Sequence, residues 1–170
     1  YPIDVFIADI DSDGDLDIVS ASVNDNTIAW YENDGAANPT FTAADIATSA
    51  DGARDVHVAD MDGDGDLDIV SASFRDDTVA WYENNGAADP TWTAADIATS
   101  ADGAIAVTIA DIDGDGDLDI LSASANDDTI AWYENQGVAG NHLLTIADVT
   151  ASNENAANAT FTVSLSAAVK

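Results

Sequence analysis

The sequence predicts an all-β fold built from three tandem repeats of four strands each, followed by a C-terminal β segment. Two observations predict it. The chain resembles itself at an offset of 51 residues, as Trp30, Trp81 and Trp132 illustrate. Segments rich in Ile, Val, Thr, Trp and Tyr alternate with segments rich in Asp, Asn, Gly and Pro, which is typical of short strands joined by turns. No segment keeps a helical period of apolar residues, so we expect almost no helix.

The four strands of the first unit are expected at roughly residues 4–10, 16–22, 27–33 and 40–47, with equivalents 51 and 102 residues later, although the third unit has one inserted residue near Asn141. On this pattern the repeats span residues 1–49, 50–100 and 101–150. The C-terminal β segment then spans residues 151–170.

Several strands carry neighbouring apolar residues, such as Ile18-Val19 and Trp30-Tyr31, so both faces of each sheet are apolar. A sheet with two apolar faces must pack between two others, as the blades of a β-propeller do. Closed propellers have about 4–8 blades. Three repeats therefore predict part of a larger or assembled propeller, or an open stacked array.

The composition is strongly acidic. The chain holds 33 Asp and Glu against 3 Lys and Arg, a formal charge of −30, and this self-repulsion disfavours a compact state unless a cation compensates it. The charge argues against nucleic acids and anionic membranes as partners, because both require a basic surface. Since there is no cysteine, a metal ion is the obvious alternative to a disulfide as a clamp.

Features of the whole chain bear on its location. No apolar run approaches about 18 residues, so we expect no membrane span. The chain has no signal peptide and begins with Tyr1 rather than Met. We therefore expect a processed chain or one segment of a longer one.

An aspartate-rich loop follows the first expected strand of each repeat. Counted from Asp9 as position 1, aspartates stand at positions 1, 3, 5, 7 and 9, and Gly14 at position 6 allows a sharp turn. The candidate metal ligands are the aspartates of the three loops: Asp9, Asp11, Asp13, Asp15, Asp17, Asp60, Asp62, Asp64, Asp66, Asp68, Asp111, Asp113, Asp115, Asp117 and Asp119.

Calcium suits these loops best, because Ca²⁺ takes six to eight hard oxygen ligands. The loops are not EF-hands: Ser20 stands at position 12 instead of a bidentate Glu, and the flanks are strands. Mg²⁺ prefers to keep its waters, and zinc and iron prefer His or Cys. We expect three Ca²⁺ per chain, with position 9 closing the coordination sphere. Position 7 should offer its carbonyl, which lets the Asp15 side chain point outward.

A single Asp-Gly run can be only a solvated turn. Three copies at fixed spacing, with the apolar flanking residues Ile10 and Leu16 also repeated, argue against that reading. Carboxylates packed this closely repel one another strongly unless a cation lies among them.

The pattern Asp-x-Asp-x-Asp-Gly-x-x-Asp between strands, in a repeat of about 50 residues, resembles the FG-GAP/VCBS repeat, whose superfamily includes the propellers of integrin α-subunits. The resemblance covers about residues 1–150. It implies a β-propeller blade with calcium at one rim, bound by positions 1, 3, 5 and 9. The Phe-Gly motif is absent, and Gly35-Ala36-Ala37 is only a trace of Gly-Ala-Pro, so ligand-contact residues are not carried over.

Residues 144–168 resemble the opening of a Calx-β domain, which is a β-sandwich common in bacterial surface proteins. The segment LTIADVT also fits the fourth strand of the third unit. The alternating apolar residues Phe161, Val163 and Leu165 fit a strand that adds to a sheet edge.

Catalysis is not expected. Glu32, Glu83 and Glu134 recur in every unit, whereas a catalytic acid is normally unique, and His57 and His142 occupy unrelated positions. There is no nucleophile elbow and no phosphate-binding loop.

Two kinds of residue remain as candidates for ligand contact. The Trp-Tyr pairs fit sugar stacking, but core packing explains them better. Arg54 and Phe74-Arg75 break the repeat, which ordinary surface variation also explains.

The sequence as a whole predicts a noncatalytic, calcium-binding module of a secreted or cell-surface bacterial protein, for adhesion or recognition of a glycan or protein. The alternative is a structural subunit of a calcium-stabilised extracellular filament or surface layer. Self-association, or membership of a longer chain, is expected because three blades leave open end faces.

Overall fold

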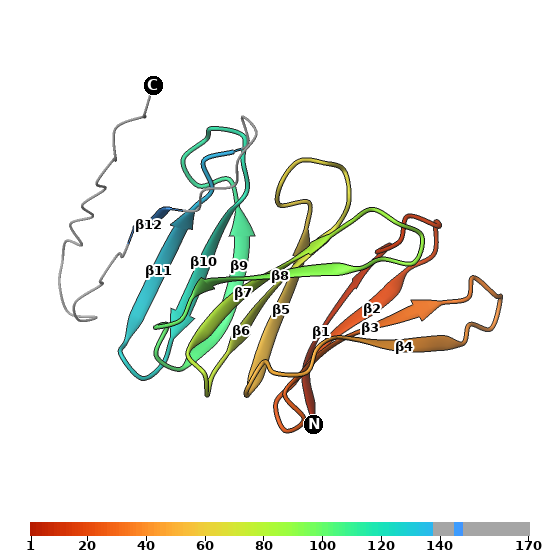
Figure 1. The fold of residues 1–170 in the computed structure, drawn as a ribbon, viewed down its shortest axis with the longest axis horizontal. Helices are drawn as coiled ribbons and strands as arrows, with labels where there is room; N and C mark the ends of the chain where they lie inside the picture. The colour runs from red at the N-terminus through yellow and green to blue at the C-terminus, as the bar shows by residue number, and fades with distance from the viewer. Residues whose placement is uncertain (138–144, 148–170) are drawn as a thin grey trace.

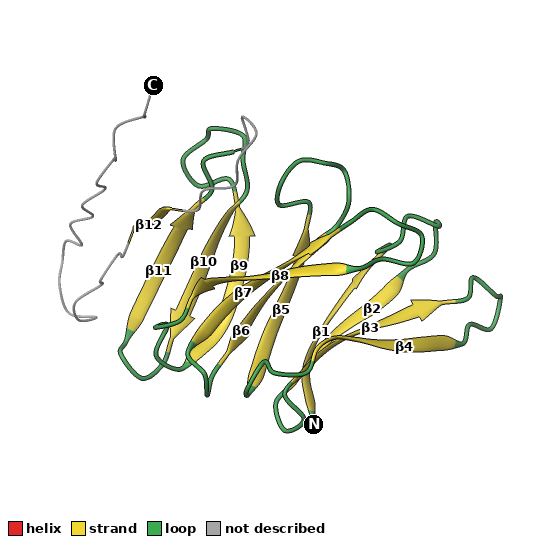
Figure 2. Ribbon diagram, in the orientation of Figure 1, coloured by secondary structure: helices red, strands yellow, loops and turns green. Residues whose placement is uncertain are grey.

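The computed structural model describes residues 1–137 and 145–147, and these form twelve strands in three antiparallel sheets (Figures 1 and 2). The prediction of an all-β fold of three four-stranded repeats is confirmed. The described residues contain no helix, and hence none that could cross a membrane. Over this part of the chain the sheets lie in a row in chain order and do not close into a ring (Figure 1).

Each sheet is a meander in which consecutive strands pair. The first sheet consists of β1 (Pro2–Ala8), β2 (Asp17–Ser22), β3 (Thr27–Asn33) and β4 (Phe41–Ala47). The second consists of β5 (Ala53–Ala59), β6 (Asp68–Ser73), β7 (Thr78–Asn84) and β8 (Trp92–Ala98). The third consists of β9 (Ala104–Ala110), β10 (Asp119–Ser124), β11 (Thr129–Glu134) and β12 (Thr145–Ala147).

In the first two sheets the expected strand positions agree with the structure to within two residues. The largest difference is in β1, which ends at Ala8 rather than at residue 10. The backbone N–H of Ile10 donates to the Asp17 carboxylate instead of to a neighbouring strand. Ile10 is therefore part of the loop.

The first strands of the sheets, β1, β5 and β9, lie next to one another along the row. Each contains a register shift near its start, between Pro2 and Asp4 in β1 and at the equivalent places in β5 and β9. A β-bulge of this kind changes the direction of a strand and of the side chains beside it.

The core lies between the sheets and not within a single layer. One cluster joins the first two sheets, where Trp30 packs with Tyr82, and a second joins the last two, where Trp81 packs with Tyr133. Trp30 and Trp81 are 4% and 7% exposed. Their burial supports core packing, not sugar stacking, as the role of the Trp-Tyr pairs.

Some predictions concern residues outside the described part of the chain. These are the C-terminal β segment 151–170, most of the segment that resembles a Calx-β domain, and His142. Within the Leu-Thr-Ile-Ala-Asp-Val-Thr segment, residues Thr145–Ala147 form β12 and pair with β11.

Candidate metal centre

The three aspartate loops join the first and second strands of each sheet and lie along the same side of the row (Figure 1). Each loop begins after the first strand of its sheet, which is β1, β5 or β9. The apolar residue at position 2 lies beneath the loop in the first two sheets. Ile10 and Met61, at position 2 of the first two loops, are only 2% and 5% exposed. The first two loops therefore sit on the hydrophobic core and are not free turns, whereas Ile112 of the third loop is 43% exposed.

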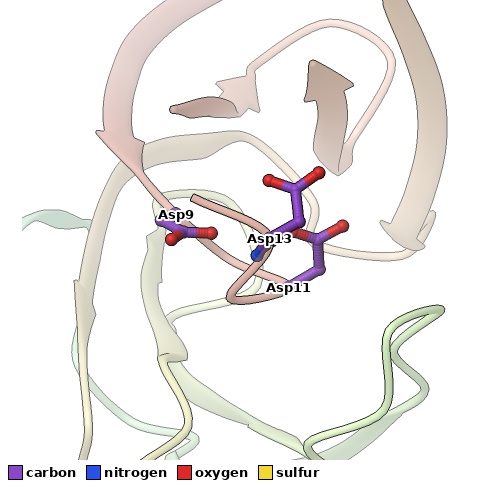
Figure 3. Close-up of side chains that lie close together, drawn as sticks. All are labelled: Asp9, Asp11 and Asp13. Atoms are coloured by element: carbon purple, nitrogen blue, oxygen red, sulfur yellow. Dashed lines mark hydrogen bonds between the residues drawn. The ribbon is translucent and has the colours of Figure 1, made fainter. Parts of the chain in front are cut away.

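Each loop brings three carboxylates together. Their oxygen atoms lie within 4.8 Å of one another in the groups Asp9, Asp11 and Asp13, Asp60, Asp62 and Asp68, and Asp111, Asp113 and Asp115. Figure 3 shows the first group arranged around the turn. Positions 1 and 3 belong to every group, whereas position 5 belongs to the first and third groups and position 9 to the second.

Backbone N–H groups inside the loop hold these carboxylates in place. Gly14 N donates to Asp9 Oδ2 at 3.0 Å, and Asp15 N donates to Asp13 Oδ1 at 2.9 Å. The second and third loops repeat both bonds. Because an ionised carboxylate has about four acceptor sites, these bonds leave lone pairs available for a cation.

Position 9 lies beneath the loop. Asp17, Asp68 and Asp119 are at most 1% exposed. Asp68 accepts the N–H of Met61 with Oδ2 at 3.1 Å and the N–H of Asn84 with Oδ1 at 2.8 Å. The other two loops make the same pair of bonds. Position 9 therefore ties the loop to the end of the third strand.

Position 7 takes a different place. The Asp15 carboxylate lies against Gly35, where an added Cβ would collide with it, and Gly35 has a φ of +66°. Asp66 and Asp117 lie in the same way against Gly86 and Gly137. The position-7 side chain is therefore outside the three-carboxylate groups and packs on the turn that follows the third strand.

One buried atom tests whether a cation fits the first loop. Asp9 Oδ1 is buried and has no hydrogen-bond partner among the described residues. In the second and third loops the equivalent atoms, Asp60 Oδ1 and Asp111 Oδ1, accept the N–H of Gly63 at 2.8 Å and of Gly114 at 2.7 Å. A buried oxygen anion without a donor is unfavourable unless a cation lies beside it. The residues present thus fit a hard cation.

The electrostatics of the loops point the same way. Burial raises the pKa of Asp11, and the charges of Asp13, Asp17 and Glu32 raise it further, although the N–H of Asp13 opposes the change. Burial likewise raises the pKa of Asp62, with Glu83 among the contributing charges. Burial raises the pKa of Asp68 to about 7. Without a counter-ion, these carboxylates hold their protons more tightly than ordinary aspartates do.

We expect the calcium-free protein to lose stability as the pH rises from 5 to 8. Burial raises the pKa of Asp55 to about 6 and that of Asp68 to about 7, both above the usual 3.8. Between about pH 4 and 7 the folded chain therefore binds more protons than the unfolded chain, so the free energy of unfolding falls as the pH rises through this window. Urea unfolding in chelator at pH 5 and pH 8 measures the effect.

Asp55→Asn is the matched control for this pH dependence. It removes one titrating group and keeps an oxygen to accept the N–H of Val107, which donates to Asp55 Oδ2 at 2.7 Å. The variant should show a smaller change between the two pH values. Greater stability at pH 8 than at pH 5 in the calcium-free parent protein would contradict the expectation.

The asparagine of each Trp-Tyr-Glu-Asn segment, which ends β3 and β7 and directly follows β11, has a role that the sequence did not predict. Asn33 donates its N–H to Asp17 and its side-chain amide to Leu16 O, and it accepts the N–H of Gly35. Asn84 and Asn135 repeat these bonds. The threefold recurrence of Trp-Tyr-Glu-Asn was the available signal, because a polar residue kept at one register position indicates a repeated hydrogen-bond role.

The residues that break the repeat are engaged within the protein. The Arg75 side chain donates to Val23 O at 2.8 Å and pairs with Asp51 at 3.4 Å, both in earlier parts of the chain. The Arg54 guanidinium lies 5.1 Å from the centre of the Phe74 ring. The bond from Arg75 to Val23 O links the second repeat to the first, whereas Arg54 and Phe74 contact each other within the second repeat. His57 packs against Phe6, with ring centroids 5.0 Å apart.

Two equivalent grooves separate neighbouring sheets. One, of about 450 Å³, lies between residues 46–50 and the face of the second sheet that carries Thr78 and Tyr82. The other, of about 560 Å³, lies between residues 97–101 and the face of the third sheet that carries Thr129 and Tyr133. Asp96 lines both grooves.

Comparison with known proteins gives one family. The model of the FG-GAP-like repeat matches residues 9–71 and residues 60–122. Each match begins at position 1 of an aspartate loop and ends at position 12 of the next, and together they cover more than half of the chain. No curated protein matches the chain, and no solved structure does.

Proposed function

The chain belongs to the FG-GAP-like repeat family, and from this premise we propose that it is a noncatalytic, calcium-binding module for adhesion or recognition at or outside the cell surface. FG-GAP-like repeats are typically noncatalytic and common in extracellular proteins. The specific parts of the proposal are the ion, the location and the recognition role.

The observation that carries calcium binding is that a group of three carboxylates, always including positions 1 and 3, forms in each of the three loops. Each loop holds three carboxylates with oxygens within 4.8 Å of one another, and Asp9 Oδ1 is buried without a donor. The donor set consists only of oxygen, which suits Ca²⁺ and not zinc or iron. Positions 1, 3 and 5 would hold the ion from the loop, and the buried position-9 carboxylate would hold it from below.

Calorimetric titration of the chelator-treated chain should give three Ca²⁺ per chain. Asp13→Ala removes one carboxylate of the first group, so it should weaken one site and leave the other two nearly intact, because their ligands belong to other sheets. Asp45→Ala is the matched control, since it removes the same charge from an exposed position of β4 outside every loop. Absence of calcium uptake by the parent chain would refute the proposal.

A noncatalytic role is supported by the distribution of the acidic groups. The carboxylates that come together do so three times in equivalent loops, whereas an active site needs one asymmetric arrangement of an acid and a base. Recognition of a glycan or protein would use surfaces between neighbouring sheets. The two grooves lined by Asp96 are the concave surfaces to test first, by binding of a glycan panel to the parent chain and to Asp96→Ala.

A second candidate function is a structural subunit of a calcium-stabilised filament or surface layer. The observation that favours it is the exposure of apolar residues on the first and last sheets, including Val5 and Ile130. Electron microscopy of the chain in calcium separates the two functions. Discrete particles support a recognition module, and filaments support a structural subunit.

A further inference from the structure

Each sheet has two different apolar faces, which we call leading and trailing. In the second sheet the leading face packs on the first sheet, and the trailing face packs on the third. The leading face of the second sheet consists of Val56, Val58, Ile69, Ala80 and Tyr82. Its trailing face consists of Met61, Val70, Ala72, Val79 and Trp81. The 51-residue repeat gives the first and third sheets the same two faces.

Among the described residues, none packs on the leading face of the first sheet. Val5 is 59% exposed, whereas its equivalents Val56 and Val107 are 3% and 6% exposed. Ile7 is 60% exposed, and its equivalent Val58 is 8% exposed. The repeat therefore places an apolar residue at each of these positions. In the part of the chain that the structure describes, a preceding sheet covers this residue only in the second and third sheets.

The trailing face of the third sheet is open in the same way. Ile130 is 47% exposed, whereas its equivalents Ile28 and Val79 are completely buried. Ile112 is 43% exposed, and its equivalents Ile10 and Met61 are almost fully buried. In the described part of the chain, the first sheet thus exposes a leading face and the third sheet exposes a trailing face. A leading face packs on a trailing face at both interfaces inside the chain.

Polar groups at the two ends also match the internal interfaces. The Asn84 amide donates to Ile10 O at 3.2 Å across the first interface, and Asn135 donates to Met61 O at 2.8 Å across the second. The next pair in this series would join Asn33, on the open leading side, to Ile112 O, on the open trailing side. The first sheet therefore carries the donor, and the third carries the acceptor.

One position interrupts this complementarity. Asp4 accepts the N–H of Val56 at 3.0 Å, and Asp55 accepts the N–H of Val107 at 2.7 Å, so each internal interface has one such bond. Ala106 is the equivalent residue of the third sheet. An interface formed at the open trailing face thus lacks one carboxylate acceptor.

We propose that the trailing face of the third sheet binds the leading face of the first sheet of a second copy of this chain. The occupant is a second copy because the two faces that the described residues leave exposed are the same two kinds of face that pack together inside the chain. Such a head-to-tail contact closes into a ring or continues as a filament. Two copies would supply six sheets, which falls within the range of about 4–8 blades in closed propellers. The pairing of faces does not depend on the proposed calcium sites.

Two substitutions test the contact, because each blocks one face at a residue that is exposed in the single chain. Val5→Asp blocks the leading face, and Ile130→Asp blocks the trailing face. In sedimentation velocity at physiological ionic strength, the parent chain should run as a dimer or larger, and each variant alone as a monomer. An equimolar mixture should form a heterodimer and nothing larger, because Val5→Asp keeps an intact trailing face and Ile130→Asp keeps an intact leading face.

Thr93→Asp adds the same charge to an exposed position of β8 in the middle sheet, and it should leave the association unchanged. Near-ultraviolet circular dichroism checks that every variant keeps the packing of its Trp and Tyr residues. A monomeric parent chain at tens of micromolar overturns the proposal. So does an assembly that one of the two face variants leaves intact, since that result indicates contact between like faces.

A gain-of-function variant tests the register of the contact. Ala106→Asp supplies the acceptor that Asp4 and Asp55 provide at the internal interfaces. One added charge-assisted hydrogen bond should tighten the association roughly tenfold. An unchanged or weaker association of Ala106→Asp would contradict the register assigned to the interface.

Discussion

Removal of calcium is expected to lower the free energy of unfolding by about 8 kcal/mol when the free ion is in hundredfold excess over its dissociation constant. Each of the three proposed sites contributes about 2.7 kcal/mol under that condition, because the ion binds only the folded loops. For a chain of this length, the loss corresponds to a fall in melting temperature on the order of 20 °C. The electrostatic reason is the charge of −30, which three Ca²⁺ change to −24 (−30 + 3 × 2).

Thermal unfolding in chelator and in millimolar calcium measures this effect. Magnesium at the same ionic strength is the control, because it screens charge equally but prefers to keep its waters. Identical melting curves in chelator and calcium would contradict the proposed sites. An equal stabilisation by magnesium would show general screening and not coordination.

Asp68→Ala is expected to destabilise the calcium-free chain by roughly 2–6 kcal/mol, because it leaves two buried N–H groups without an acceptor. Those groups belong to Met61 and Asn84, and both oxygens of the buried Asp68 carboxylate accept them. The variant therefore affects the fold even before a metal ion binds. Urea unfolding in chelator at pH 8 provides the measurement.

Asp64→Ala is the matched control for Asp68→Ala. Asp64 stands in the same loop and is exposed, and it accepts the N–H of Asp66 at 2.9 Å. Its loss should change the calcium-free stability by less than about 1 kcal/mol. Equal destabilisation by the two variants would show that the position-9 carboxylate has no special structural role. Asp68→Asn should fall between them, because the amide keeps one oxygen acceptor and removes the buried charge.

Much of the fold could be predicted because each repeat is a short-range pattern. Alternation of β-branched and aromatic segments with turn residues locates the strands of the first two sheets to within two residues. Because the same pattern occurs in three units, a strand that is unclear in one unit can be located from its equivalents in the others. The loops could be recognised for the same reason, since Asp9, Asp11 and Asp13 are close in sequence as well as in space.

The remaining features depend on contacts between distant parts of the chain. The Asn84 amide donates to Ile10 O, 74 residues earlier, and spacing within one repeat does not reveal such a bond. The contact of Asp15 with Gly35 likewise joins two turns of the same sheet. Membership of the three-carboxylate groups also differs between loops, although their spacing is identical, because the fold of each turn determines which oxygens converge.

The two-faced design of the sheets has a consequence for how such a chain changes in evolution. Each 51-residue unit carries one leading face, one trailing face and one aspartate loop. Duplication or loss of one whole unit therefore leaves a row that still ends in the same two faces, and it creates no new kind of interface. A substitution on one face needs a compatible partner only in the adjacent unit. Array length can thus vary by recombination between near-identical repeats, while the packing of each neighbouring pair stays under selection.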